Sequence, residues 1–393
     1  MTTARHNHKQ MSNIPKVDIA FSNGNLLKNI PAIDGQIAFI GTGAGTGDVA
    51  LQTVYTVNGL ADAVAQGFAL ADEPTAYNHL KEFYAELGGN QEVYILLVAN
   101  TVTMAQMLDY TNANYASKLI TGGAGKISHL GVFRDPVSGY NAGANFMDAD
   151  VSAAVLVAKT FVQYQNTQLR YLRVLIEGRI NNESSTTIFE PNTASAGQCG
   201  VVLGSTTNNK GASIGLALAR RAKYPCHIKL GKTANGPLSA TAVYIGTKLL
   251  KDVANLDALH GKGYISFVTY PQKAGFYFGI DNMASADDYR LLVNGAVVDA
   301  AAKIAASVYI DELESEVDTN ADGTVTDLDA KHLEDIITQQ VTATMGNRIS
   351  AVSALVDRTV NIINTGKVKV TVRVRPRGYT TFIDVDLGLT AGN

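Results

Sequence analysis

Apolar and polar positions follow one another along the first two thirds of the chain in runs that predict strands and helices in turn. Short apolar runs bounded by turn residues predict strands at residues 35–43, 92–100, 129–135, 171–180 and 199–205. Amphipathic runs with helix start and stop signals predict helices at residues 59–67, 73–89, 148–168 and 211–224. Strands that alternate with helices build a mainly parallel sheet flanked by helices, so the pattern predicts an α/β fold.

The pattern changes after about residue 255, where longer elements follow. Residues 263–282 predict two antiparallel strands, and residues 286–317 predict one long amphipathic helix. A second long helix is predicted at residues 327–356, with Gly346 as a point of interruption. Residues 367–389 alternate in both halves around a Pro-Arg-Gly turn, which predicts a β-hairpin. The last third therefore predicts an α+β domain.

Both ends of the chain are predicted strands without an obvious partner. Residues 1–16 are polar and predict a disordered arm, and residues 16–21 alternate as a strand does. A hairpin at residues 367–389 would be marginally stable alone, so it needs a partner in the same chain or strands from neighbouring subunits. One face of its first arm carries Val368, Val370, Val372 and Val374, and the other carries Lys367, Lys369, Thr371, Arg373 and Arg375.

The chain length of 393 residues suggests two or three domains. Changes in the pattern of elements set the predicted boundaries. These are 1–34 for an N-terminal arm and strand, 35–114 for the first part of the α/β core, 115–261 for a middle α/β domain, 262–366 for a C-terminal domain with two long helices, and 367–393 for a C-terminal hairpin arm.

Composition narrows the classes of function. Charged residues make up 17% of the chain, against roughly 25% in an average soluble protein. A surface so poor in charge is typical of one that other subunits cover. The net charge of −3 gives no electrostatic reason to expect nucleic-acid binding. The cysteines, Cys199 and Cys226, are too few for a disulfide framework and are predicted to be small buried residues.

The sequence predicts neither Sec secretion nor insertion into a membrane. The polar first sixteen residues lack the apolar core of a signal peptide. No run of about 18 apolar residues occurs along the chain. We therefore expect an assembly that is made in a cytoplasm.

Two glycine-rich segments imitate phosphate-binding loops but fail the required spacing. In GTGAGTGD, Thr46 or Asp48 replaces the third glycine of the dinucleotide fingerprint, depending on the starting glycine. We therefore expect a flexible connection there. In TGGAGKIS, Ile120 stands where a P-loop needs glycine, and Ile127 stands where it needs a hydroxyl. No HExxH pattern occurs, and we identify no catalytic constellation along the chain, so the sequence predicts no enzyme. An α/β nucleotide- or substrate-binding enzyme is the alternative.

The stretch DTNADGTVTDLD, residues 318–329, has the pattern of a calcium loop, with Gly323 at its turn position. The candidate ligands are Asp318, Asn320, Asp322, Thr324 and Asp329. The same residues also fit a metal-free turn, in which Thr326 caps the next helix and Asp329 stands three residues later. Dockerins carry two such loops and this chain has one. A calcium-dependent, dockerin-like module and a metal-free turn both stay open.

Three stretches, in this order, resemble contractile tail sheath proteins of myophages and related injection systems. The resemblance is to a divergent branch seen in prophages and Bacteroides-type elements. Residues 39–98 have a strand, a glycine-containing loop, two helices and an apolar strand. Residues 263–308 have a strand pair and a long helix, with Tyr289 and Arg290 where the family has an aromatic–arginine pair. Residues 363–389 resemble the closing hairpin of the family.

The resemblance implies a structural subunit that polymerises helically around a tail tube and contracts to drive the tube through a cell envelope. The implied partners are further copies of itself, the tail tube protein, the baseplate and the tail terminator, with neither nucleic acid nor membrane insertion. The implied location is a virion tail or injection-system particle assembled in a bacterial cytoplasm. No cofactor is expected apart from the calcium candidate. The loop at residues 318–329 departs from common sheath proteins.

The resemblance also implies an α+β C-terminal sheath domain with terminal arms that exchange strands with adjacent subunits. Such arms keep a lattice connected while its subunits rotate. The residues implied in the exchange are Val17, Ile19, Phe21, Val368, Val370, Val372, Val374, Phe382 and Val385.

Overall fold

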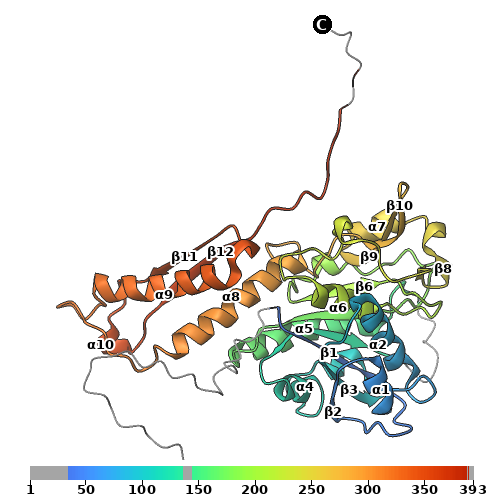
Figure 1. Cartoon of the computed structure of the whole chain (residues 1–393), viewed down its shortest axis with the longest axis horizontal. Helices are drawn as coiled ribbons and strands as arrows, with labels where there is room; N and C mark the ends of the chain where they lie inside the picture. Colours follow the sequence, from blue (N-terminus) through green and yellow to red (C-terminus); the bar gives the residue numbers. More distant parts are fainter. Residues whose placement is uncertain (1–33, 136–143, 387, 389–393) are drawn as a thin grey trace, which may run out of the picture. The chain divides into compact units, whose positions relative to one another are not determined.

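A computed structural model of the chain describes residues 34–135, 144–386 and 388 (Figure 1). The predicted N-terminal arm and strand, with Val17, Ile19 and Phe21, lie outside the described residues.

A mainly parallel sheet forms the centre of the fold. Its eight strands lie in the order β10-β9-β6-β5-β4-β1-β3-β2. The strands from β9 to β3 in this order are parallel, and the two edge strands, β10 and β2, are antiparallel to their neighbours. The bounds are β1 Gln36–Gly43, β2 Val54–Val57, β3 Val93–Ala99, β4 Ile127–Phe133, β5 Arg173–Gly178, β6 Cys199–Leu203, β9 Tyr264–Tyr270 and β10 Lys273–Phe278.

Helices cover both faces of this sheet, which confirms the α/β prediction. On one face α2 and α6 pack against each other, and Gly131 of β4 leaves room for α6, because a Cβ there would lie 2.5 Å from Leu218. On the other face α5 packs on β5 and β6, where the thiol of Cys199 contacts the carbonyl of Val155 at 3.6 Å. The bounds are α1 Leu60–Ala65, α2 Pro74–Leu87, α3 Met104–Met107, α4 Ala116–Gly122, α5 Ala149–Thr167, α6 Ile214–Lys223 and α7 Leu256–Gly261. A short hairpin, β7 Tyr244–Ile245 and β8 Lys248–Leu249, precedes α7.

The central strands read as continuous apolar runs because helices cover both of their faces. In β1 and β4 nearly every residue is buried. Both cysteines are free and buried, as predicted.

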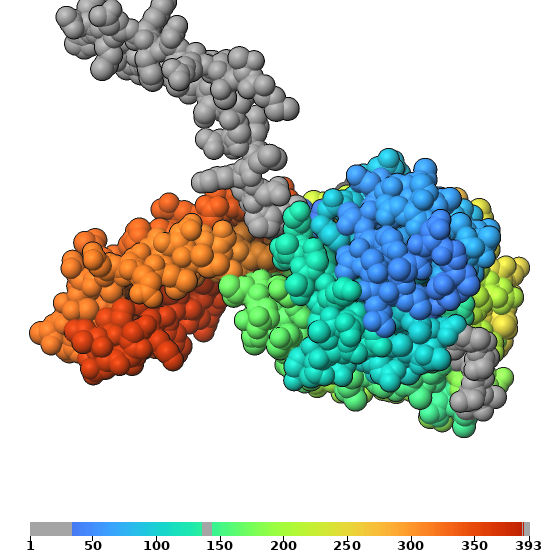
Figure 2. Space-filling model, turned by 90° about the horizontal axis from the view of Figure 1, so that it is seen from below, coloured from blue at the N-terminus to red at the C-terminus, as the bar shows by residue number. Residues whose placement is uncertain are grey.

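The last part of the chain forms a smaller layer, which we call the C-terminal module. It comprises α8 Leu292–Ile310, α9 Asp327–Met345, β11 Ala351–Val356, α10 Ile362–Thr365 and β12 Val370–Arg375. β11 and β12 pair antiparallel as a separate two-stranded sheet that packs on α9. The module has its own hydrophobic cluster, distinct from the cluster around the large sheet, and is orange to red in Figure 2.

Three predictions for this region were wrong in part. The helix predicted at 327–356 ends at Met345, because Gly346 takes a positive φ of 49° and the chain then enters β11. The hairpin predicted at 367–389 does not form, since β12 pairs back with β11 and residues 376–386 contain no strand. The helix predicted at 286–317 is shorter, so Tyr289 and Arg290 precede α8 rather than open it.

Among the described residues, one helix, α8, is long and apolar enough to cross a membrane, with a mean hydropathy of 1.3. Core helices of globular proteins also meet this criterion. Its buried residues Val297, Ala300 and Ile304 pack with α9 residues in the hydrophobic cluster of the module. α8 is therefore a packing helix of the fold.

Candidate functional site

The described chain begins at a residue that is tied to the C-terminal module. Both carboxylate oxygens of Asp34 accept hydrogen bonds from Arg348 Nη1, at 2.8 and 2.7 Å. Asp34 Oδ1 also accepts from the backbone N–H of Cys226 at 2.8 Å. Arg348 stands in the short turn between α9 and β11. The residues that follow the N-terminal segment are therefore anchored where the two-stranded sheet begins.

The C-terminal segment leaves the fold at this same turn. The backbone N–H of Ser350 donates to the carbonyl of Arg375 at 2.8 Å, and its hydroxyl donates to the carbonyl of Pro376 at 3.1 Å. Arg377 donates to the carbonyl of Asn347. Residues 347–350 thus bind both Asp34, the first described residue, and the residues that follow β12.

A second contact holds the root of the C-terminal segment against the core. The hydroxyl of Tyr379 donates to the carbonyl of His227 at 2.7 Å. Lys229 Nζ lies 5.5 Å from the centroid of the Tyr379 ring, within the range of a cation–π contact. Beyond this point Phe382 and Val385 are 80% and 69% exposed.

The two faces of β12 differ as the sequence predicts. Val370, Val372 and Val374 are half-buried and pack toward the helices, whereas the residues between them are exposed. Val368 joins the small cluster at the far end of the module. On the outer face Arg373 stands opposite Ser353, and Arg375 stands opposite Ala351. This face is therefore basic, with small neighbours on β11.

The interpretation of the exchange site changes in one respect. β12 already has β11 as a partner in its own chain, so the valines line a sheet that helices support. Within the described residues, the outer edges of β11 and β12 pair with no further strand. Exchange with a neighbouring subunit stays a prediction, and these edges are where a strand would add.

The loop at residues 318–329 uses most of its candidate ligands in internal hydrogen bonds. Asp322 Oδ1 accepts from the N–H and hydroxyl of Thr324, at 3.0 and 2.7 Å. Asn320 turns its amide nitrogen inward and donates to Thr324 Oγ1 at 3.0 Å. Asp329 Oδ2 accepts from the N–H of Asp318 at 2.7 Å, while Thr326 caps α9 as predicted. These bonds are those of a capped turn.

The same loop is fastened to α10. Asn361 donates its side-chain amide to the carbonyl of Asp322 at 2.6 Å, and the N–H of Ile362 donates to the carbonyl of Gly323 at 2.9 Å. Gly323 has a φ of 78°, which favours glycine at this turn. In the part of the chain that the structure describes, no group of three or more His, Cys, Asp or Glu could hold a metal ion. Calcium binding and a metal-free turn therefore both stay open for this loop.

The glycine loop after β1 lies where ligands usually bind in an α/β sheet, at the carboxyl ends of the strands. A buried carboxylate of the chain itself fills it. The backbone N–H groups of Ala44 and Gly45 donate to Glu73 Oε2 and Oε1, at 2.9 and 2.8 Å. Glu73 is 2% exposed. The loop is therefore held in place rather than flexible, and its amide donors bind an internal anion.

Other internal carboxylates line the same edge. Asp150 accepts from the first N–H groups of α3, on Met104 and Ala105, and from Arg134. Such N–H groups at a helix start are the donors that bind phosphate in nucleotide-binding proteins. Glu177, at the end of β5, accepts from two further backbone N–H groups, those of Arg134 and Ala212.

Glu82 of α2, whose side chain is 14% exposed, is a further acid of this set. Its Oε1 accepts hydrogen bonds from the hydroxyls of Thr206 and Ser213, at 2.5 and 2.7 Å. Burial raises the pKa of Glu82 to about 7, although the two hydroxyls oppose the shift. The neighbouring imidazole of His79 stays neutral, because burial and Arg179 lower its pKa to about 3.

The second glycine-rich segment lies at the opposite edge. Gly125 and Lys126 connect the end of α4 to the start of β4, whereas a P-loop runs from the end of a strand into a helix. This geometry agrees with the failed spacing.

Sequence reasoning did not identify the residues that anchor the two chain ends. Asp34 and Arg348 are 314 positions apart, and neither stands in a recognisable motif. Another buried contact could have been predicted from the sequence, because a charged residue inside an otherwise apolar element indicates a buried partner. Arg173 in β5 and Asp299 in α8 carry that signal, and they form a buried ion pair at 2.6 Å.

Solved structures of contractile injection systems share this fold. A chain of the anti-feeding prophage (AFP) baseplate aligns with a TM-score of 0.59 at 12% identity, over 97% of this chain and 100% of that chain. A chain of the contracted AFP helical sheath aligns with a TM-score of 0.59 at 13% identity, over 96% of this chain and 99% of that chain. A chain of the contracted PVC sheath complex, from an extracellular contractile injection system, aligns with a TM-score of 0.56 at 12% identity, over 98% of this chain and 99% of that chain. The sheath-like fold predicted from the sequence is confirmed.

No curated protein sequence matches the chain. A family model described as DUF2586, N-terminal domain, matches residues 14–282, which is more than half of the chain. The chain is therefore a member of the DUF2586 family, with the fold that chains of contractile injection systems adopt.

Proposed function

We propose that the chain is the structural subunit of a contractile sheath. It polymerises helically around a tail tube and contracts to drive the tube through a cell envelope. The observation that carries the proposal is the likeness to chains of AFP and PVC assemblies along 96–98% of the chain, including the C-terminal module. A likeness restricted to the α/β core would be weaker support, because that fold serves many functions.

Assembly would use the two chain ends. Asp34, the first described residue, and Pro376, the first residue after β12, are both held by the short turn that leads into β11. Each segment would add a strand to the sheet of β11 and β12 in an adjacent subunit. Such a contact is heterologous, and heterologous contacts that do not close produce open helical filaments. The N-terminal contribution would come from Val17, Ile19 and Phe21.

Side-chain chemistry favours the C-terminal segment as one of these strands. In an extended conformation, Ile383 and Val385 share one face, and Phe382, Asp384 and Asp386 share the other. In the sheet of the adjacent subunit, Ile383 and Val385 would lie on the same side as the valine face of that subunit's β12. The second would place two carboxylates beside the exposed Arg373 and Arg375, and Phe382 beside the exposed Leu355.

The chain would act without catalysing a reaction. At the carboxyl edge of the sheet, Glu73, Asp150 and Glu177 occupy the backbone donors that a substrate or nucleotide would need. The energy for contraction would then come from rearranged contacts between subunits. Further partners would be the tail tube protein, the baseplate and the tail terminator, in a virion tail or injection-system particle assembled in a bacterial cytoplasm.

Negative-stain electron microscopy of the purified chain tests the proposal. We expect long tubes from the full chain, and we expect a variant lacking residues 1–22 to stay folded but to form no tubes. The melting temperature of the truncated variant is the control for folding. Small closed particles from the full chain under all conditions would contradict the sheath function. Tubes from the truncated variant would contradict strand exchange by the N-terminal segment while leaving the sheath function intact.

A further inference from the structure

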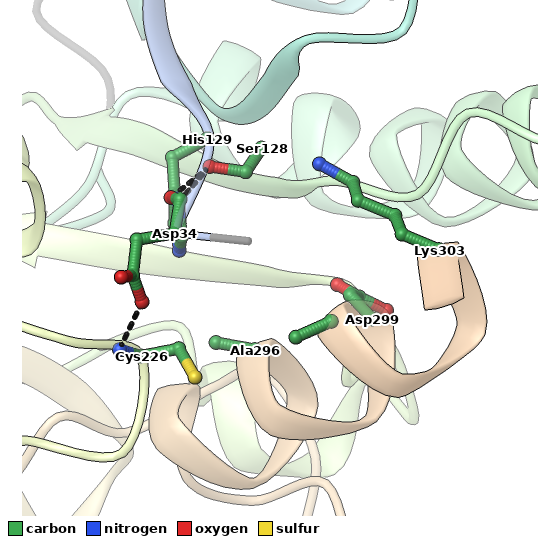
Figure 3. Close-up of a pocket in the computed structure, with 8 residues that line it drawn as sticks. Asp34, Ser128, His129, Cys226, Ala296, Asp299 and Lys303 are labelled. Carbon is green, nitrogen blue, oxygen red and sulfur yellow. Dashed lines mark hydrogen bonds between the residues drawn. The ribbon is translucent and has the colours of Figure 1, made fainter. Parts of the chain in front are cut away.

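The C-terminal module and the α/β core meet through buried charged groups. α8 begins in the hydrophobic cluster of the core, at Leu292, and continues in the cluster of the module, from Ala296 onward. Five charged or ionisable residues lie where α8 passes from one cluster to the other, and we call them the joint: Asp34, His129, Arg173, Asp299 and Lys303. Figure 3 shows all of them except Arg173.

An ion pair fixes α8 at the joint. Arg173 of β5 donates to both oxygens of Asp299, at 2.6 and 2.7 Å. The same guanidinium donates to the carbonyls of Gly197 and Gly295, at 2.9 and 3.3 Å. Glycine is required at position 295, because a Cβ there would lie 2.6 Å from Arg173 Nε. The pair is thus fully engaged, and little of Asp299 is left for other donors.

Lys303 stands one turn beyond Asp299 and lacks such a partner. Its Nζ is buried and has no hydrogen-bond acceptor among the described residues. Burial lowers the pKa of Lys303 to about 8, against an opposing effect of Asp299. An ammonium group in this position needs a further acceptor, since an unpaired buried charge is costly.

His129 of β4 supplies the complementary group. The hydroxyl of Ser128 donates to the carbonyl of Asp34 at 2.7 Å, so its oxygen accepts from His129 Nδ1 at 2.9 Å. Burial, with Arg221 and Lys303 nearby, holds the pKa of His129 well below its usual range. The neutral ring therefore carries its proton on Nδ1. Its Nε2 is a buried acceptor without a hydrogen-bond partner among the described residues.

Lys303 and His129 line a small cavity of about 10 Å³, whose lining residues are drawn in Figure 3. That volume corresponds to one water molecule, and a buried water needs two or more polar partners. We propose that the cavity is a hydration site for one water molecule, which accepts a hydrogen bond from Lys303 Nζ and donates one to His129 Nε2. The water completes the hydrogen bonding of the joint and makes the attachment of α8 to the core depend on the proton carried by Lys303.

The direction of this dependence follows from proton linkage. When the joint opens, Lys303 regains its usual pKa, near 10.4, so between about pH 8 and that value the open form binds more protons than the closed form. The closed joint therefore gains stability as pH rises through this window. The other groups that face the cavity or its lining are Asp34 with Arg348, Asp299 with Arg173, His129 with Arg221, and Cys226.

Two substitutions separate the water from the charge. Lys303→Met removes both the donor and the charge, so we expect no density for a water in a high-resolution structure. Lys303→Gln keeps a donor without the charge, so we expect the water to remain. In the wild type the density must lie within hydrogen-bonding distance of Lys303 Nζ and His129 Nε2. Its absence there, or a proton on Nε2 in nitrogen NMR of labelled histidine, would overturn the hydration site.

Hydrogen exchange of α8 tests the proton dependence. We expect the protection of amides near Lys303 to rise by up to about a hundredfold between pH 7.5 and pH 10 in the wild type. We expect no such rise in either Lys303 variant, whereas Lys331→Met, which removes an exposed lysine of α9, should behave as the wild type. The same pH profile in all four proteins would contradict the inference. These measurements use the unassembled chain, so their outcome is independent of whether it forms tubes.

Discussion

At the scale of single residues, the chain places its own acids where other α/β proteins bind ligands. Glu73 occupies the amide donors of the glycine loop, and Asp150 occupies those at the start of α3. Both carboxylates are buried, so each depends on these bonds to offset its loss of hydration. The chain's own carboxylates therefore take the backbone donors that bind ligands at this edge in other α/β proteins.

Glu82 gives this arrangement a measurable signature. Its pKa in the folded chain, about 7, lies above the usual 4.5, so the folded state binds more protons between these values. The contribution of Glu82 to stability is complete below pH 4.5 and is lost as pH rises toward 7. We expect the wild type to lose up to about 3 kcal/mol of unfolding free energy across this window relative to Glu82→Gln.

Denaturant unfolding of both proteins at pH 5 and pH 8 measures this difference. Glu316→Gln changes an exposed carboxylate and is the matched control, for which we expect the wild-type profile. Equal pH profiles for Glu82→Gln and the wild type would show that Glu82 is ionised in the fold at both pH values.

At the scale of elements, sequence patterns predicted the strands and helices of the core better than the pairing of the strands in the C-terminal module. The strands and helices of the core follow local periodicity, and the parallel sheet follows from their alternation. β11 was missed because its six residues, AVSALV, read as a continuation of the apolar pattern of α9. Once β11 was missing, β12 had no partner except the residues after its turn, so a false hairpin was predicted.

The candidate site was predictable to a similar degree. The valine face of β12 follows from alternation alone and is confirmed by burial. The anchoring pair Asp34–Arg348 depends on tertiary packing between residues far apart, and no local pattern encodes it. The role of Glu73 at the glycine loop was missed for the same reason, because Glu73 stands 28 positions along the chain from Gly45.

The loop between α8 and α9 allows a direct test of calcium binding. Since Asp322, Asn320 and Asp329 are engaged within the turn, we expect the melting temperature to be equal in calcium and in chelator. We expect Asp322→Ala to lower it equally in both, because Thr324 loses its acceptor. Differential scanning calorimetry gives both values, with Glu316→Ala as the control. A higher melting temperature in calcium, abolished by Asp322→Ala, would establish the metal site instead.

At the scale of the whole molecule, the proposed lattice depends on contacts between copies of the chain. The outer face of β12 carries Arg373 and Arg375, and the C-terminal segment carries Asp384 and Asp386. Like charges brought together across an interface are costly, whereas opposite charges fix register. The proposed strand addition therefore predicts that these two pairs of residues depend on one another.

A charge exchange tests that dependence. We expect Arg373→Glu with Arg375→Glu to reduce sedimentable polymer by at least about tenfold while the melting temperature changes little. Adding Asp384→Lys and Asp386→Lys should restore polymer. The matched control, Lys81→Glu with Lys232→Glu, changes the net charge equally at exposed positions elsewhere and should polymerise normally. Polymer that forms regardless of the arginine changes would exclude this register of strand addition.

The most direct test of the sheath proposal is a helical reconstruction, by electron cryomicroscopy, of the polymer that the purified full chain forms. The account predicts tubes in which the sheet of β11 and β12 in every subunit is extended by terminal strands from adjacent subunits. A chain that remains in small closed particles under all conditions, or whose two-stranded sheet gains no strand from a neighbour, would contradict it.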